Sequence, residues 1–174
     1  MVWRATTAEA KDTSGTARRS ALEGRVKGGV PVGILGYRDG VPVAWCSIAP
    51  RETYRPMGGV DGDGGHAPNA DPVQRGRENG ARVESVWSVV CFFIPKAMRG
   101  QGIMPRLLKA AVEHARLHGA TVVEAYPVDP DSPSYRFMGF VHTFEAAGFR
   151  EVGRAGIRRH VMRLDAVALG SETT

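Results

Sequence analysis

The stretch that decides the fold is 86–119, which reads VWSVVCFFIPKAMRGQGIMPRLLKAAVEHARLHG. Residues 86–94 are almost all apolar, β-branched or aromatic, and this composition predicts a buried strand that ends before Pro95. A helix is predicted after a short basic turn, because apolar residues recur at the i, i+3, i+4, i+7 spacing of a helix packed on a sheet. These apolar residues are Leu108, Ala111, Val112 and Ala115.

The turn between strand and helix, Arg99-Gly100-Gln101-Gly102, has the composition of a phosphate-binding loop. Unpaired N–H groups and the positive end of the dipole attract anions to a helix N-terminus, and glycine lets the backbone approach them. Two common nucleotide patterns do not fit. The dinucleotide pattern G-x-G-x-x-G needs a glycine where Pro105 stands, and the Walker pattern needs a G-K-[ST] sequence.

A third pattern, Arg-x-x-Gly-x-[Gly/Ala], matches the run Arg99-Gly100-Gln101-Gly102-Ile103-Met104 except for the methionine at its end. This run and the later Phe144-Glu-Ala-Ala-Gly148-Phe149 resemble the coenzyme A pyrophosphate loop and the "GF" motif of the GCN5-related N-acetyltransferase (GNAT) superfamily. The resemblance covers roughly 29–164. Stretches such as GVPVAWCSIAPRETY and FEAAGFREVGR are also similar to a bacterial GNAT subgroup of mostly unassigned substrate.

The resemblance implies an α/β (α+β) fold of the GNAT type: a central mixed, mostly antiparallel sheet with a βαβ acetyl-CoA-binding core and flanking helices. It implies an acetyl-CoA-dependent N-acetyltransferase that acts on a primary amine of a small molecule or a protein. In that fold the two parallel strands splay apart, and the cofactor lies between them and the glycine turn. The cofactor-binding residues implied here are Phe92, Phe93, Ile94, Arg99, Gly100, Gln101, Gly102, Ile103 and Met104.

Acetylation of an amine needs a base for the amine and an acid for the departing thiolate. Glu84, at the head of the central strand, and Glu124, in the next strand, are the candidate bases, and either could equally be a solvated strand-end charge. Many GNAT enzymes place a tyrosine acid four residues before the glycine of "GF", and that position here is Phe144. Tyr135 is therefore the candidate acid. Tyr126, His142 and solvent are the alternatives.

The sequence predicts a GNAT domain at 29–165. It also predicts three regions that do not belong to the core of this domain. Residues 1–28 are expected to be a shortened N-terminal segment with a helix over 16–26. The Gly/Pro/Asp/Asn-rich stretch 51–82 is expected to be a mobile loop, either a substrate lid or a simple insertion. Residues 166–174 are expected to be a frayed tail.

Within the domain, further elements follow from local patterns. Residues 31–49 are predicted to form a hairpin that turns at Asp39-Gly40. Residues 121–128 are predicted to form a second buried strand, parallel to the first after the usual crossover. A helix over 137–147 with Phe137 facing inward, and a final strand over 160–164, complete the prediction.

The composition, 43% hydrophobic and 24% charged in 174 residues, is that of a globular protein. No apolar run approaches the ~20 residues of a membrane span and no signal sequence is evident, so a cytoplasmic protein is expected. Cys46 and Cys91 lie in apolar strand patterns and are expected to be buried thiols. No His/Cys spacing indicates a metal site.

The net charge of +5 would suit a polyanionic cofactor, and equally a solvated basic surface. The basic residues are scattered and no nucleic-acid-binding motif accompanies them, so nucleic acid is not the expected partner. Two alternatives stay open: a non-catalytic acyl-CoA-binding or sensory module, which the missing tyrosine favours, and an acetyltransferase directed at tRNA or the ribosome. A homodimer formed through a sheet edge is a further option.

Overall fold

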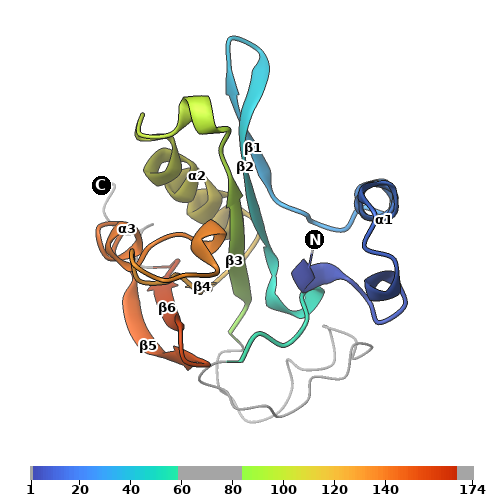
Figure 1. The fold of residues 1–174 in the computed structure, drawn as a ribbon. Helices are drawn as coiled ribbons and strands as arrows, with labels where there is room; N and C mark the ends of the chain where they lie inside the picture. Colours follow the sequence, from blue (N-terminus) through green and yellow to red (C-terminus); the bar gives the residue numbers. More distant parts are fainter. Residues whose placement is uncertain (1, 59–83, 168–174) are drawn as a thin grey trace.

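The computed structural model describes residues 2–58 and 84–167, and a six-stranded sheet forms its centre (Figure 1). The strands lie in the order β1-β2-β3-β4-β6-β5, and only β3 and β4 run parallel. This is the mixed, mostly antiparallel α/β arrangement that the family resemblance implies. The strands are β1 (Ile34–Arg38), β2 (Val41–Pro50), β3 (Val86–Phe93), β4 (Val122–Ala125), β5 (Arg150–Ala155) and β6 (Arg159–Asp165).

The helices in the described residues are three α-helices and several short 3-10 turns. The α-helices are α1 (Gly15–Lys27), α2 (Ile103–Leu117) and α3 (Val141–Glu145). The 3-10 turns are η1 (Val2–Arg4), η2 (Glu9–Lys11), η3 (Arg51–Thr53), η5 (Lys96–Met98) and η6 (Arg136–Met138).

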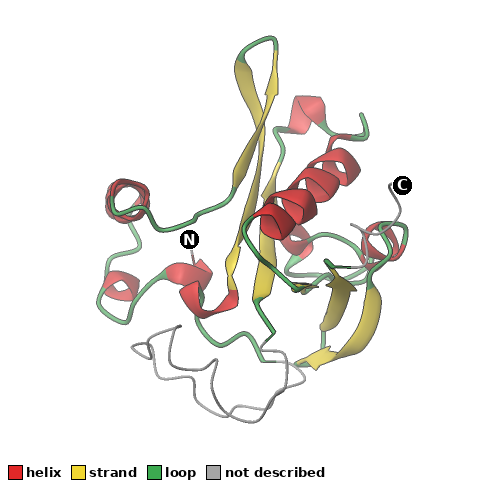
Figure 2. Ribbon diagram, turned by 180° about the vertical axis from the view of Figure 1, so that it is seen from behind, coloured by secondary structure: helices red, strands yellow, loops and turns green. Residues whose placement is uncertain are grey.

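The sheet separates two hydrophobic cores. Helix α2 covers one face (Figure 2), and side chains such as Ile48, Val89, Leu108, Val123 and Phe144 are buried there. A smaller cluster lies on the opposite face and includes Tyr54, Val90, Tyr126, Met138 and Val161. Each fully buried side chain of this size contributes about 1.5–3 kcal/mol of transfer free energy, so both faces stabilise the sheet.

Helix α2 confirms the prediction made from its spacing. All four predicted core residues are buried, together with Leu107. The helix begins after Gly102, whose φ of 66° places it in the left-handed region, and Gly119 follows the other end with a φ of 84°. Because glycine tolerates a positive φ, these two glycines determine where the helix begins and ends.

The predicted hairpin is also confirmed. Its turn residues Asp39 and Gly40 have φ values of 51° and 77°, and a type I′ turn requires positive φ at both positions. The hairpin joins β1 to β2 and projects beyond the rest of the sheet (Figure 1). The predicted helix over 16–26 corresponds to α1, which has no buried residue.

The predicted helix over 137–147 is wrong in extent. The chain forms η6, passes through Gly139 with a φ of 93°, and only then enters α3. Val128 donates a backbone hydrogen bond to Gly139 at 3.0 Å and accepts one from Val141 at 3.2 Å. These bonds hold the segment in an extended bridge, which a continuous helix would break. As a result Phe137 is 44% exposed instead of facing inward.

The remaining differences concern the sheet edge and the loops. Strand β5 was not predicted, because its mostly exposed and charged sequence has no apolar alternation. The final strand was predicted, and β6 confirms it with slightly wider bounds. Most of the predicted mobile loop, 59–82, and most of the tail, 168–174, lie outside the described residues. The division of the chain into regions stays a prediction.

Gly139→Ala is expected to destabilise the fold. A Cβ at this position would meet Met104 Cε and Phe144 Cε2, the latter at 2.8 Å, and the backbone conformation is one that only glycine adopts readily. Strained backbone alone costs about 1–3 kcal/mol, and the overlap adds to it. Urea denaturation would measure the loss.

Gly156→Ala is the matched control, because Gly156 also has positive φ, at 73°, but no heavy atom lies within 4 Å of its Cβ position. Its loss should stay near 1–2 kcal/mol, roughly the left-handed penalty alone. Equal losses in the two variants would contradict the tight packing around Gly139.

Candidate active site

The parallel strand pair at the centre of the sheet opens before β3 ends. Its last pair is Val89↔Ala125, and residues 90–93 of β3 continue beyond it. After β4 the chain leaves the ladder, and Val128 forms an isolated bridge with Phe140. Backbone groups on this edge of β3 have no strand partner among the described residues. An extended ligand could therefore pair with them as an added strand would.

A bulge lies in β3 where the pair opens. Ser47 is paired with Cys91 and Ile48 with Val89, so Val90 is an extra residue without a partner on β2. A bulge re-aims the side chains around it. Here both Val90 and Cys91 line a cavity on the face of the sheet opposite α2.

The glycine turn before α2 presents backbone donors to open space. Gly100 and Gly102 have φ values of 74° and 66°, and a Cβ on either would meet no heavy atom within 4 Å. The first N–H groups of a helix have no intrahelical partner. In addition, residues 100–102 donate no backbone hydrogen bond to another described residue. The turn is therefore an anion cradle, formed by the backbone N–H groups of residues 100–102. Glycine, which has no Cβ, leaves this space free for an anion.

Basic side chains surround this turn. Arg99 donates from Nε to the carbonyl of Ile94 at 3.0 Å, and Arg106 donates to a carbonyl of the turn at 3.3 Å. Arg38 of β1 donates to Gln101 Oε1 at 3.2 Å. Sequence analysis missed Arg38 and Arg106. Arg38 stands 63 positions before Gln101, so no local pattern could indicate it.

The other predicted cofactor residues divide between the core and the surface. Phe92, Ile94 and Met104 pack partly buried against the core on the α2 face, whereas Phe93 is 60% exposed. The ring centroid of Phe92 lies 6.2 Å from that of the fully buried Phe144. The phenylalanine at the position expected for the acid is thus part of the core.

The cavity next to the bulge measures about 170 Å³. It lies between the N-terminal segment, β2, β3 and η6. Its walls are mainly apolar, and its polar groups come from Arg4, Ser47 and Tyr54. The residues that line it are Trp3, Arg4, Trp45, Ser47, Tyr54, Val90, Cys91 and Phe137.

Sequence analysis missed the polar part of this cavity. Arg4 donates to the hydroxyls of Tyr54 and Ser47, and those two hydroxyl oxygens are 3.1 Å apart. Burial raises the pKa of Tyr54 to about 12, with the Arg4 charge acting in the opposite direction, so the phenol is neutral at ordinary pH. These residues come from two distant segments and no spacing links them.

Glu124, one candidate base, belongs to a buried ion-pair network. Its Oε2 accepts a hydrogen bond from Arg163 Nε at 2.7 Å and lies 3.6 Å from Arg51, and the Tyr126 hydroxyl donates to its Oε1. Burial, and then the nearby Glu124 charge, raise the pKa of Tyr126 well above its usual range. Both carboxylate oxygens of Glu124 are therefore already engaged.

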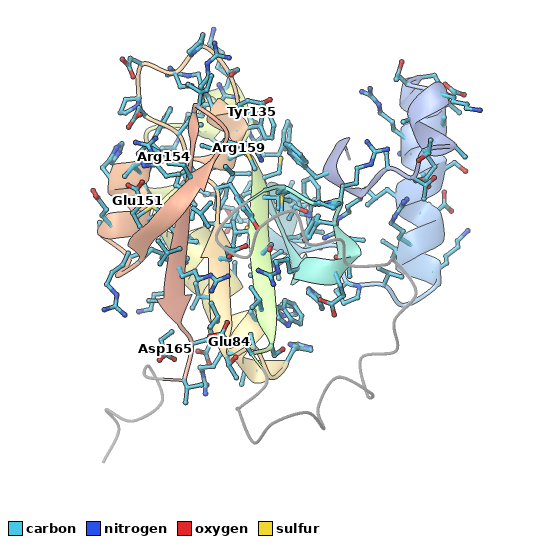
Figure 3. The ribbon with its side chains drawn as sticks, turned by 90° about the horizontal axis from the view of Figure 1, so that it is seen from below. Glu84, Tyr135, Glu151, Arg154, Arg159 and Asp165 are labelled. Carbon is cyan, nitrogen blue, oxygen red and sulfur yellow. The ribbon has the colours of Figure 1, made fainter. Side chains whose placement is uncertain are left out.

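The structure does not bring the three candidate catalytic residues together. The Glu84 side chain is 58% exposed and lies 3.6 Å from Arg163. Tyr135 lies at the other end of the sheet, beside Arg159 (Figure 3), and its ring centroid is 6.4 Å from that of Trp3. Because Trp3 lines the cavity, Tyr135 lies close to the cavity, whereas Glu84 does not.

The described residues contain no group of three or more His, Cys, Asp or Glu side chains that could hold a metal ion. Cys46 is buried and Cys91 half-buried, both are free thiols, and burial raises the pKa of each. Neither thiol is therefore activated as a nucleophile. No helix within 2–58 or 84–167 is both long and apolar enough to cross a membrane.

Arg163→Leu is expected to destabilise the protein by about 3 kcal/mol, because it leaves a buried carboxylate short of its main partner. Glu124→Gln should cost less, about 1–2 kcal/mol, since the amide keeps part of the hydrogen bonding. Chemical denaturation would measure both. Arg116→Leu is the control, because it breaks only the exposed pair with Glu113, and it should cost less than about 1 kcal/mol. Similar losses for the two arginine variants would contradict a buried network.

Solved structures with a similar fold include several acetyltransferases. The N-acetyltransferase from Staphylococcus aureus Mu50 superposes with a TM-score of 0.55 at 13% identity, over 88% of this chain and 78% of that one. The yncA protein from Salmonella typhimurium, solved with its cofactor acetyl-CoA, gives 0.54 at 17% identity, over 89% of this chain and 76% of that one. At these identities the likeness shows the fold alone.

Sequence comparison gives the family. An acetyltransferase from Agrobacterium fabrum, Atu2258, is 38% identical over 68 residues, which span 39% of this chain and 44% of that relative. Residues 3–140 match the family described as Acetyltransferase (GNAT) family. This match includes the open strand pair, the bulge and the glycine turn, and the chain belongs to the GNAT family of acetyltransferases.

Proposed function

We propose that this chain transfers the acetyl group of acetyl-CoA to a primary amine of a small molecule or a protein. One observation carries the proposal: the open edge of β3 and the glycine turn of α2 lie at the same end of one strand. A ligand with an anionic end and an extended, amide-containing arm matches both features. Family membership supports the same reaction.

The residues present fit the cofactor. The pyrophosphate would take the N–H groups of the glycine turn, where the missing Cβ atoms leave space, and the charges of Arg99, Arg38 and Arg106. The arm would pair with residues 90–93 of β3. When bound, acetyl-CoA supplies an activated acyl group in the form of a thioester.

The chain's own groups have three tasks. Backbone N–H groups at the β3 bulge would polarise the carbonyl of the donor, which is the task of an oxyanion donor. The cavity beside the bulge would hold the amine next to the same strand. The exposed strand edge would orient the donor, so that positioning provides much of the rate enhancement.

Proton transfer has no assigned group at the position used by many relatives. Phe144 is fully buried and has no proton to give. Tyr135 lies beside the cavity, at its ring contact with the lining residue Trp3, and is 36% exposed. We propose Tyr135 or solvent as the acid. Glu84 and Glu124 are engaged with Arg163 and neither lines the cavity, so we do not expect either to act directly on the amine.

Gly102→Val should abolish binding of acetyl-CoA, because a branched side chain would fill the cradle and displace its N–H groups. Titration calorimetry with acetyl-CoA and with free CoA would measure the loss. Gly119→Val is the matched control at the other end of α2, since its φ is 84° and its Cβ position is also open. It should cost similar stability and leave the affinity unchanged. Unchanged binding by Gly102→Val would refute the phosphate-loop assignment.

Arg99→Ala should weaken acetyl-CoA binding by only about tenfold, ~1.4 kcal/mol, because the backbone donors remain. The same calorimetric titration applies. A loss as complete as that of Gly102→Val would show that the guanidinium, and not the backbone cradle, holds the pyrophosphate.

A further inference from the structure

Arg4 is a buried cation at the polar side of the cavity. It is 6% exposed and lines the cavity beside the β3 bulge. The hydrogen-bond partners of its two terminal nitrogens are all neutral oxygens. They are the Pro31 carbonyl at 2.9 Å and the hydroxyls of Thr53 at 3.2 Å, Ser47 at 3.5 Å and Tyr54. Its Nε has no partner among the described residues.

No described carboxylate compensates this charge. In the N-terminal segment Glu9 is paired with Arg25 at 2.7 Å, and no described acidic side chain lines the cavity. Tyr54 stays a neutral phenol. Burial, together with the neighbouring Arg25, lowers the pKa of Arg4, which reflects the same lack of an opposite charge. A buried charge without a counter-charge is costly, and the described residues supply none, so a bound anion would compensate it.

A second arginine adds to the positive field. The guanidinium carbon of Arg159 lies 4.8 Å from the ring centroid of Trp3 and 5.3 Å from that of Tyr135. Its buried NH1 has no hydrogen-bond partner in the described part of the chain. Trp3 lines the cavity and its own buried indole N–H also has no partner there. Three buried donors at or next to the cavity therefore lack a partner among the described residues, and unpaired donors suit an acceptor-rich anion.

The rest of the cavity is apolar. Trp3, Trp45, Val90 and Phe137 form its walls, and the exposed ring of Phe93 belongs to the residue paired with Trp45 on the neighbouring strand. A ligand that is complementary to both the polar side at Arg4 and the apolar walls carries an anionic group and an apolar side chain. A polycationic amine would meet like charge at Arg4 and is disfavoured.

We infer that the acceptor is a small amino-carboxylate with an apolar side chain, whose carboxylate lies against Arg4 in this cavity. The inference rests on the proposed acetyl transfer and names its substrate class. Such a pose would hold the amine in a fixed position beside the β3 bulge, and a fixed position favours attack on a carbonyl.

The test compares matched amines with the wild-type protein. Alanine, leucine, methionine and phenylalanine are each assayed beside their carboxamides and beside the amines without the carboxyl group, with thiol release from acetyl-CoA as the readout. For the best side chain, the kcat/KM of the amino acid should be at least about tenfold higher than that of its carboxamide. The reason is that the amide leaves the buried guanidinium uncompensated. Equal or better rates for the amides would overturn the inference while leaving acetyl transfer itself intact. If acetyl-CoA binds but no compound in an otherwise broad amine panel is acetylated, the proposed function fails.

A binding measurement separates the cavity from catalysis. Phenylpropanoate, which has the carboxylate but no amine, should raise the melting temperature of the wild-type protein, whereas phenylpropanamide should not. Arg4→Met should abolish the effect of phenylpropanoate and the preference for amino acids, and Arg4→Lys should restore part of both. Stabilisation by both compounds, or by neither, would contradict the inference.

Arg25→Met is the control for fold damage in the same segment. Arg25 is paired with Glu9 and donates to the Arg4 carbonyl at 2.8 Å, but it does not line the cavity. Its loss should lower stability and leave the amino-acid preference unchanged. Loss of the preference in Arg25→Met as well would show that Arg4 acts only through the fold of the segment.

Discussion

The structure depends on the short parallel pairing between β3 and β4. Two parallel strands that follow one another in the chain need a crossover, and α2 provides it here. The start of α2 must therefore lie at the carboxyl end of β3. Because the pairing stops at Val89↔Ala125, the same end of β3 has an unpaired edge. The topology of the sheet alone therefore places the anion cradle and the unpaired strand edge together.

The bulge at Val90 connects this edge to the other face of the sheet. Without the extra residue, consecutive side chains of β3 would alternate between the two cores. With it, Val90 and Cys91 both line the cavity, and the backbone between them lies at the point where the strands open. Donor and acceptor would then approach one short piece of backbone from two sides. For this reason, the residues proposed to bind the cofactor and the residues that line the cavity come from different elements.

Local patterns predicted the parts of the fold whose stabilising contacts are close in sequence. The apolar run of β3, the helical spacing of α2 and the Asp39-Gly40 turn each contain their own evidence. The helix around Gly139 could not be predicted correctly, because bonds to the distant Val128 decide its extent. Strand β5 is stabilised by pairing with β6 and not by its own composition.

The candidate site shows the same limit. The glycine turn was visible as a motif, and the acidic residues were visible only as residue types. That Glu124 is engaged by Arg51, Arg163 and Tyr126 depends on contacts between three segments. Arg4 and Tyr54 meet across 50 positions of sequence, and no periodicity predicts such a pair.

Met104, Gly139 and Phe144 form one packing unit that joins the start of α2 to α3. The methionine end and the phenyl ring occupy the space that a side chain at position 139 would need. These three positions are therefore constrained to change together, and substitutions among them should show strong epistasis. A tyrosine introduced at position 144 would bring its hydroxyl into this apolar contact without a partner. A change to tyrosine at position 144 would consequently require prior repacking of the other two residues.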